Sequence, residues 1–228
     1  MNESLRHLRK HREFAQLIKK HGPPDLKRYH GRERIFTAIL RSIISQQIST
    51  SAARSIRERF LKLFPKSGPT PELLLQSPIE TLRAAGLSTQ KVYYMRDAAE
   101  KFNDSTVNPK NFSRMTSDEI TEHLVQIKGV GVWTAHMLLI FTLNRPDTLP
   151  VGDLGIKKGF QKVYKLRTLP SPTHMERLAK PWRAHASVAS WYLWRAADEA
   201  KTVPKRPLKK LLPPAKLKAR RKRHSPRS

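Results

Sequence analysis

The sequence predicts an all-α protein, and three observations support that fold class. Apolar residues recur at intervals of three and four along most of the chain, which is the repeat of one helix face. Prolines, glycines and small polar residues gather between those segments, as they do in loops. No stretch of useful length alternates apolar and polar residues in the way a half-buried strand requires.

Helical periodicity recurs from near the start of the chain to about residue 200. In order, the helical segments are REFAQLIKKH (12–21), RIFTAILRSIISQQI (34–48), TSAARSIRERFLKLF (50–64), PIETLRAAG (78–86), KVYYMRDAAEKF (91–102), DEITEHLVQI (118–127), VWTAHMLLIFTL (132–143) and SVASWYLWRAADEA (187–200). Stretches rich in helix breakers separate them at 65–71, 103–111, 144–153 and 169–173.

Two helix starts carry explicit capping signals. Thr116 or Ser117 can cap the helix that we expect to end at Ile127. Asp153 can cap the helix LGIKKGFQKVY that follows it. Both starts therefore have side-chain oxygens able to accept from free N–H groups of the first helical turn.

Charge is the strongest global signal. The 228 residues contain 45 Lys and Arg against 18 Asp and Glu, a formal charge of +27 with a pI near 10.9. Residues 201–228 carry 12 of the basic residues and no acid, which leaves +15 for residues 1–200. Such an excess repels itself unless it meets a polyanion, so we expect a nucleic acid as partner. A basic solvated surface without a partner is the alternative.

Several protein classes are excluded by composition. Without cysteine the chain cannot form a disulfide, a thiolate zinc site or an iron–sulfur cluster, and it has no cysteine nucleophile. No apolar run approaches the ~18 residues of a membrane-spanning helix, and the first residues lack the apolar stretch of a signal peptide. We therefore expect an intracellular protein without a membrane partner.

A change of composition near residue 202 predicts a domain boundary. Residues 1–201 hold the helical segments, whereas 202–228 are rich in Pro, Lys and Arg and poor in large apolar residues. We expect a helical domain followed by a basic tail with little fixed structure, which adds non-specific DNA affinity.

The segment IKGVGVWTA (127–135) places a glycine-containing turn between two predicted helices. Glycines at 129 and 131 allow positive φ and a close approach of the backbone to a partner. Free N–H groups at the start of the second helix can then bind phosphate oxygens. An ordinary helix C-cap is the alternative. A dinucleotide-binding fingerprint is disfavoured, because it needs a preceding strand and a third glycine.

Asp153 lies beyond a proline-rich turn that returns the chain toward this hairpin. Its simplest role is that of an N-cap, and a second role is compatible with capping. The positive end of the helix dipole keeps such a carboxylate ionised. An ionised carboxylate beside bound DNA can stabilise the oxocarbenium-like sugar of a breaking glycosidic bond or orient water.

The run LVQIKGVGVWTAHMLLIFTLNRPDTLPVGDLGIKKGF (124–160) resembles the helix–hairpin–helix DNA glycosylase superfamily, and the chain is similar to its alkyladenine (3-methyladenine II) type. The likeness extends to SIISQQISTSAA (42–53), AAGLSTQKVYYMRDAAE (84–100) and PWRAHASVASWYLW (181–194). The resemblance implies two helical lobes flanking a DNA-binding cleft. It also implies a compact form, because only about 30 residues precede the first long core helix.

The resemblance also implies roles for individual residues. Asp153 matches the catalytic aspartate, and Ile48 matches the wedge that fills the gap left by a flipped nucleotide, although an isoleucine in such a helix is otherwise a core residue. Trp191 matches an aromatic residue of the base pocket, with Trp133 beside it, whereas Trp182 and Trp194 fit a helix core. Implied DNA contacts are Gln47, Ser49, Lys128, Gly129, Val130, Gly131 and Thr134. The backbone carbonyls implied to hold a monovalent cation, Na or K, are those of Val125, Ile127 and Val130.

The chemistry implied is hydrolysis without strand cleavage. Trp133 stands where bifunctional relatives carry a lysine nucleophile, so no Schiff base is expected and water attacks the sugar. Alkylated purines such as 3-methyladenine and 7-methylguanine carry positive charge, which makes them good leaving groups and attracts them to indole faces. Flipping brings such a base out of double-stranded DNA. We expect a monomer that needs no cofactor beyond the possible structural cation.

Alternatives remain open at this point. The chain fits a non-enzymatic helix–hairpin–helix DNA-binding protein, or a glycosylase of the same fold for deaminated or mismatched bases. His136 is the nearest other candidate acid, but a packing role is expected for it. The His7 and His11 pair has metal-ligand spacing without a third ligand, so we expect a solvated surface there.

Overall fold

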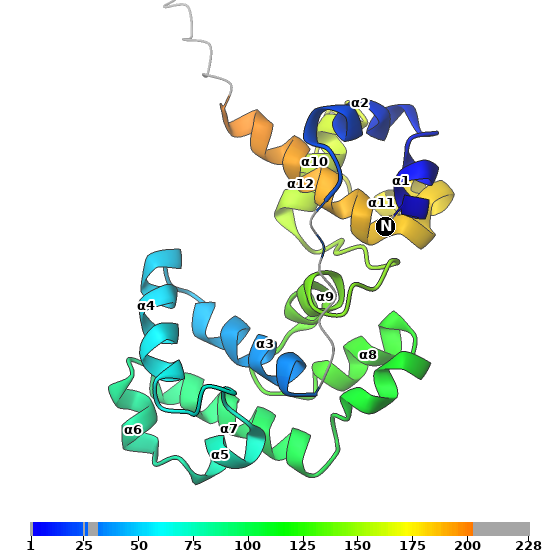
Figure 1. The fold of residues 1–228 in the computed structure, drawn as a ribbon. Coiled ribbons are helices and arrows are strands. Elements are labelled where there is room, and N and C mark those ends of the chain that lie inside the picture. The colour runs from blue at the N-terminus through cyan, green and yellow to red at the C-terminus, as the bar shows by residue number, and fades with distance from the viewer. Residues whose placement is uncertain (1, 25, 27–31, 203–228) are drawn as a thin grey trace, which may run out of the picture.

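The computed structural model describes residues 2–24, 26 and 32–202, and within these ranges the chain forms helices and loops without strands (Figure 1). The predicted all-α class is confirmed. The predicted basic tail, 202–228, lies outside the described residues except for Thr202.

Two helical lobes face each other, with one helix between them (Figure 1). The first lobe contains α3 (Arg32–Ser45), α4 (Thr50–Leu61), α5 (Pro71–Gln76), α6 (Ile79–Ala84), α7 (Thr89–Asn103), η1 (Pro109–Arg114) and α8 (Ser117–Leu124). The second contains α1 (Asn2–Leu8), α2 (Arg12–His21), α10 (Leu154–Val163), α11 (Pro172–Ala179), η2 (Lys180–His185) and α12 (Ala186–Thr202). The two cores each bury their own set of aliphatic and aromatic side chains.

The helix between the lobes is α9 (Val132–Phe141), and it contributes to both cores. Ala135, Leu138 and Leu139 pack in the first core, while Ile140 packs in the second. A helix that packs on both sides needs apolar residues around most of its circumference, and VWTAHMLLIF has that composition. The residues after the hairpin are therefore held between the two lobes.

The helix α8 ends earlier than the sequence predicts. Thr116 caps it in a capping box with Glu119, as one of the two expected caps. The helix stops at Leu124 rather than at Ile127, because the amides of the next residues turn to i−3 carbonyls; the Ile127 N–H, for example, bonds to the Leu124 carbonyl at 3.2 Å. This tightening starts the turn into the hairpin.

The second lobe is closed by the contact of α10 with α12. A Cβ atom on Gly159 would overlap the backbone of Leu193, so only glycine allows the observed approach of the two helices. Trp182 is buried beside Phe14 and donates to the Tyr164 hydroxyl at 3.0 Å, which confirms its predicted core role. The approach at Gly159 brings the first turn of α10 against α12.

Histidines join α1 to η2. The Nε2 atom of His7 is 2.9 Å from the Pro181 carbonyl, and its ring lies 4.5 Å from that of His185. The Nε2 atoms of His7 and His11 are 3.3 Å apart, a contact that requires one ring to donate and the other to accept. His7 is thus a half-exposed surface residue, as expected, but η2 folds back over α1 and covers part of it.

Acid should destabilise this protein through two half-buried histidines, His136 and His185. Burial lowers the pKa of His136 and of His185 below the ordinary 6.5, with the charge of His7 as a smaller cause at His185. Each imidazole binds its proton more readily when the chain is unfolded, so stability rises with pH between the lowered pKa and 6.5 and is lost below that window. The melting temperature should fall from pH 7.5 to pH 5. His136→Gln or His185→Gln should make this fall in melting temperature smaller. If the melting temperature of both variants falls as much as that of the wild type, these histidines are not the cause.

Candidate DNA-binding and active site

The hairpin between α8 and α9 uses its two glycines differently. Gly129 has φ +79°, and a Cβ atom there would overlap the ring of Tyr94. Gly131 has φ −91°, which any residue adopts, and an added Cβ would have no neighbour within 4 Å. The prediction of positive φ is therefore confirmed at Gly129 and wrong at Gly131. What distinguishes Gly131 is the open space around the position that a Cβ atom would occupy.

The start of α9 offers free backbone donors. Its N-cap, Gly131, has no side chain to accept from the first turn. Among the described residues, no hydrogen bond engages the N–H groups of Val132, Trp133 or Thr134. Such donors at a helix N-terminus suit an anion, and the phosphate of DNA is the anion expected from the charge of the chain. Thr134 is itself buried, so of the residues of this turn Val132 and Trp133 are the exposed ones.

Lys128 is tied to α7 on both its backbone and its side chain. Its N–H donates to the buried carboxylate of Asp97 at 2.8 Å, so this amide is not free for phosphate. Its ammonium donates to the Tyr93 hydroxyl and lies 4.6 Å from the centre of the Tyr93 ring. The pKa of Lys128 is raised by the bond to Tyr93. Its exposed charge therefore stands next to the hairpin.

The carbonyl set predicted for a cation lies at the end of α8 and in the hairpin. The Ile127 carbonyl accepts from the Val130 N–H at 3.0 Å, and no described residue donates to the carbonyls of Val125 and Val130. Neutral backbone oxygens suit a hard monovalent cation, so the donors present fit such an ion. Whether Na or K binds there stays a prediction.

The predicted wedge lies on a short loop beside the hairpin. The helix α3 ends at Ser45, not at Ile48, because the Gln46 N–H turns to the Ile43 carbonyl and Gln47 adopts φ +58°. Ile48 is 37% exposed, so it is not the core residue that a continued helix would make of it. Ser49 follows and caps α4 by accepting from the Ala52 N–H at 3.2 Å. An exposed isoleucine thus projects from the tip of a tight turn.

Asp153 combines helix capping with a second set of contacts. Its Oδ1 accepts from the Ile156 N–H at 2.8 Å, which makes it the N-cap of α10 as predicted. The same oxygen accepts from the Trp194 indole at 2.9 Å, and Oδ2 accepts from the Trp133 indole at 2.7 Å. An ionised carboxylate is an acceptor only, so three N–H donors match the charged form. The geometry suits a fixed negative charge.

The tryptophans divide differently from the sequence interpretation. Trp194, expected in the core, is half-buried, donates to Asp153 and stacks on Phe141 with ring centres 5.7 Å apart. Trp191, expected in the base pocket, has the Arg195 guanidinium 4.7 Å above its ring and is not among the hydrogen-bond partners of Asp153 in the described part of the chain; its place in the base pocket stays a prediction. Trp133 is 53% exposed, so one indole face is open to a ligand. The contact of Trp194 with Asp153 was not predicted, because Trp191 and Trp194 both fit the amphipathic pattern of α12.

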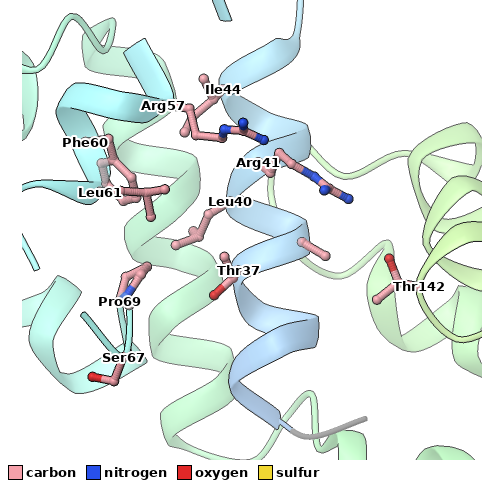
Figure 2. Close-up of a pocket in the computed structure, with 12 residues that line it drawn as sticks. Thr37, Leu40, Arg41, Ile44, Arg57, Phe60, Leu61, Ser67, Pro69 and Thr142 are labelled. Atoms are coloured by element: carbon pink, nitrogen blue, oxygen red, sulfur yellow. The ribbon is translucent and has the colours of Figure 1, made fainter. Parts of the chain in front are cut away.

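A hollow in two parts runs along α3, and neither part is lined by Trp133, Asp153 or Trp194. One part, about 260 Å³, lies between α3 and α9 and includes Phe141, the stacking partner of Trp194. The other, about 360 Å³, lies between α3 and α4, and the two parts share Arg41. Figure 2 shows Arg57 reaching from α4 toward α3, where Arg41 lies. Neither arginine has an ion pair within the described part of the chain, and the Nε of Arg57 is buried without a partner. The walls of the hollow are thus positively charged.

The comparison with protein families agrees with this geometry. A model of the HhH-GPD superfamily of base excision DNA repair proteins matches residues 40–184, which include the Ile48 loop, the hairpin and Asp153. The chain belongs to this superfamily. Within the described residues of this HhH-GPD protein, no helix is long and apolar enough to cross a membrane.

Individual relatives extend the match over most of the chain. DNA-3-methyladenine glycosylase 1 of Schizosaccharomyces pombe is 33% identical over 200 residues, or 86% of this chain and 87% of that protein. The structure of the S. pombe 3-methyladenine DNA glycosylase with abasic DNA aligns with a TM-score of 0.71 at 30% identity, covering 85% of this chain and 95% of that one. A DNA-3-methyladenine glycosidase from Bacillus halodurans aligns with a TM-score of 0.78 at 30% identity, covering 86% and 89%.

Proposed function

We propose that this HhH-GPD protein is a monofunctional DNA glycosylase, which hydrolyses the N-glycosidic bond of alkylated purines in double-stranded DNA. The observation that carries the proposal is the Asp153 carboxylate, which accepts hydrogen bonds from three N–H donors and lies next to the exposed Trp133 indole. Pure DNA binding needs no such group. The relatives named as 3-methyladenine glycosylases support 3-methyladenine as a substrate. We extend the proposal to 7-methylguanine, because it is also a positively charged alkylated purine.

Binding begins at the DNA backbone. The free amides of α9, together with the Lys128 charge, hold phosphates without reading sequence. Ile48 enters the duplex as the target nucleotide leaves it, and the vacated stack is kept open by an apolar side chain. We propose that the flipped base then stacks beside Trp133 and Trp194, whose indole faces attract a positively charged purine and whose N–H groups bond to Asp153.

Bond cleavage follows from the charge of Asp153. The bond between the sugar C1′ and the purine nitrogen breaks with its electron pair leaving on the base, which neutralises the cationic purine. Positive charge develops on the sugar, and the fixed carboxylate stabilises it. A water oxygen bonds to C1′ and releases a proton to solvent. No lysine stands at the Trp133 position to form a Schiff base, so the DNA strand stays intact.

This reaction requires no cofactor; a monovalent cation at the Val125, Ile127 and Val130 carbonyls would help the hairpin hold phosphate. We also propose that the protein acts as a monomer inside the cell, where its DNA is, in a bacterial nucleoid or a nucleus.

Base release from methylated DNA tests the proposal. The protein is incubated with duplex DNA treated with a methylating agent, and freed bases are separated and identified. We expect 3-methyladenine and 7-methylguanine, with strands that break only after alkali. Untreated DNA is the control. If both methylpurines stay on the DNA, the alkylpurine proposal fails, and release from deaminated or mismatched duplexes would assign another lesion.

Ile48→Ala should weaken binding to abasic DNA more than binding to undamaged duplex, because a wedge acts only once a base has left the stack. Both affinities are measured at one salt concentration, since phosphate contacts make them salt-dependent. Ile48 is 37% exposed and lies outside both cores, so the melting temperature should change little. Equal losses on the two DNAs would identify Ile48 as a packing residue only.

A further inference from the structure

The loop that carries Ile48 is fastened from two sides. Lys91, in the first turn of α7, donates from Nζ to the Ile44 carbonyl at 2.7 Å and to the Gln46 carbonyl at 2.9 Å. The Gln46 side chain donates from Nε2 to the Gly129 carbonyl at 2.7 Å. One ammonium therefore binds a carbonyl in the last turn of α3 and another in the loop that follows it, and one amide joins the loop to the hairpin.

The position of the Lys91 charge is unfavourable for the dipole of its own helix, α7, and favourable for the dipole of α3. A cation in the first turn of α7 opposes the dipole of that helix, whereas the same cation at the end of α3 complements the dipole there. No carboxylate pairs with Lys91 in the described ranges of the chain, and burial lowers the pKa of its ammonium. The Lys91 ammonium thus gives up hydrogen bonds to water and bonds instead to the carbonyl oxygens of Ile44 and Gln46.

The same side of α7 also holds the hairpin. Tyr94, one turn after Lys91, occupies the space that a side chain at 129 would need, and Asp97, one turn further, accepts from the Lys128 N–H. Residues at i, i+3 and i+6 of one helix thus contact the wedge loop and then the phosphate-binding turn. A single rigid helix sets the distance between these two elements.

We propose that Lys91 and Gln46 are positioning residues for base flipping, which hold the Ile48 loop in register with the hairpin so that wedge and phosphate grip act on the same nucleotide step. This inference rests on the proposed role of Ile48 as the wedge. Neither residue needs to touch the DNA. Each acts by fixing the backbone of a loop whose conformation, with Gln47 at φ +58°, is not favoured locally.

A double-mutant cycle with Ile48→Ala tests the inference. The measured quantity is the preference for abasic DNA over undamaged duplex, expressed as the ratio of the two dissociation constants, together with 2-aminopurine fluorescence next to the abasic site as a report of unstacking. Lys91→Met should lower the preference on the order of tenfold, which is within the range for a lost hydrogen bond to a charged group. Adding Ile48→Ala to Lys91→Met should lower it little further, because a misplaced wedge has already lost its effect.

Arg96→Met is the matched control. Arg96 also lies on α7 and also donates to carbonyls, those of Leu75 at 3.1 Å and Ser77 at 3.3 Å, but these belong to the α5 region away from the DNA-contacting loops. Its loss should lower the melting temperature without changing the abasic preference. Lys91→Arg, which keeps charged donors, should restore part of the preference. Gln46→Ala, which keeps the backbone carbonyl that Lys91 binds, should repeat the coupling in a variant with less risk of misfolding.

The outcomes separate the two proposals. If Lys91→Met and Gln46→Ala reduce binding to both DNAs equally, or add fully to Ile48→Ala, the positioning role is overturned. If Ile48→Ala itself leaves the abasic preference unchanged, the wedge role fails and the inference fails with it. If no methylpurine is released but the coupling on abasic DNA is present, the substrate proposal fails while the positioning role stands.

Discussion

Asp153→Asn is expected to slow single-turnover base release by about 10² to 10³, the range seen when one preorganised electrostatic group is removed. The substitution takes away the charge that stabilises the sugar cation. The amide oxygen can still accept from the Ile156 N–H and the Trp194 indole, so α10 keeps its N-cap. DNA affinity should persist or rise, since a negative charge near phosphates has gone. Release is measured with saturating enzyme, which separates the chemical step from binding.

The size of the loss should depend on the base and on the charge. 7-Methylguanine, as a strongly activated leaving group, should be affected least. The amide nitrogen introduced by Asp153→Asn would face the Trp133 indole, donor against donor, so Trp133→Phe is the control that removes this contact and leaves the carboxylate charged. It should slow release much less than the loss of charge does. A folded Asp153→Asn protein that releases bases at the wild-type rate would leave Asp153 as a helix cap only.

Gly129→Ala should destabilise the protein by about 1–3 kcal/mol, the usual cost of forcing a side chain into a packed site, with the positive φ adding strain. The new methyl would overlap the Tyr94 ring, and relief requires the hairpin to move away from α7. Binding to duplex DNA should weaken with it, because the amides of α9 leave their positions. The measurements are urea unfolding and duplex affinity at a fixed salt concentration.

Gly131→Ala provides the contrast within the same turn. Its φ of −91° suits alanine, and nothing lies within 4 Å of the added Cβ, so stability should be unchanged. If phosphate approaches the backbone there, the added methyl should still weaken DNA binding. A stable Gly131→Ala protein with wild-type affinity would show that DNA does not come close at this residue. A Gly129→Ala protein as stable as wild type would contradict the packing argument.

Local sequence signals predicted the helices well and their ends less well. Helical periodicity and breakers located the longer helices, because these signals act over a few residues, but they did not predict the short helices α1, α5 and α11. The ends of α3 and α8 were placed too late, since the apolar pattern continues through Ile48 and Ile127 while the backbone has already turned. Apolar spacing reports which side chains are buried, and it does not report where the i−4 hydrogen bonds stop.

The sequence alone determined the parts of the site that depend on neighbours along the chain: the glycine hairpin, the Asp153 cap on α10 and the positive charge for a polyanion. Only the tertiary structure decided the contacts across the chain. Trp194 reaches Asp153 over 41 positions because Gly159 lets α10 and α12 approach. Lys91 reaches the carbonyls of Ile44 in α3 and of Gln46 in the wedge loop over 47 and 45 positions. The sequence shows that a helix face is apolar or that it carries a lysine. The residue that this face or lysine contacts is set by how the helices pack, and packing depends on the shapes of residues far apart in sequence.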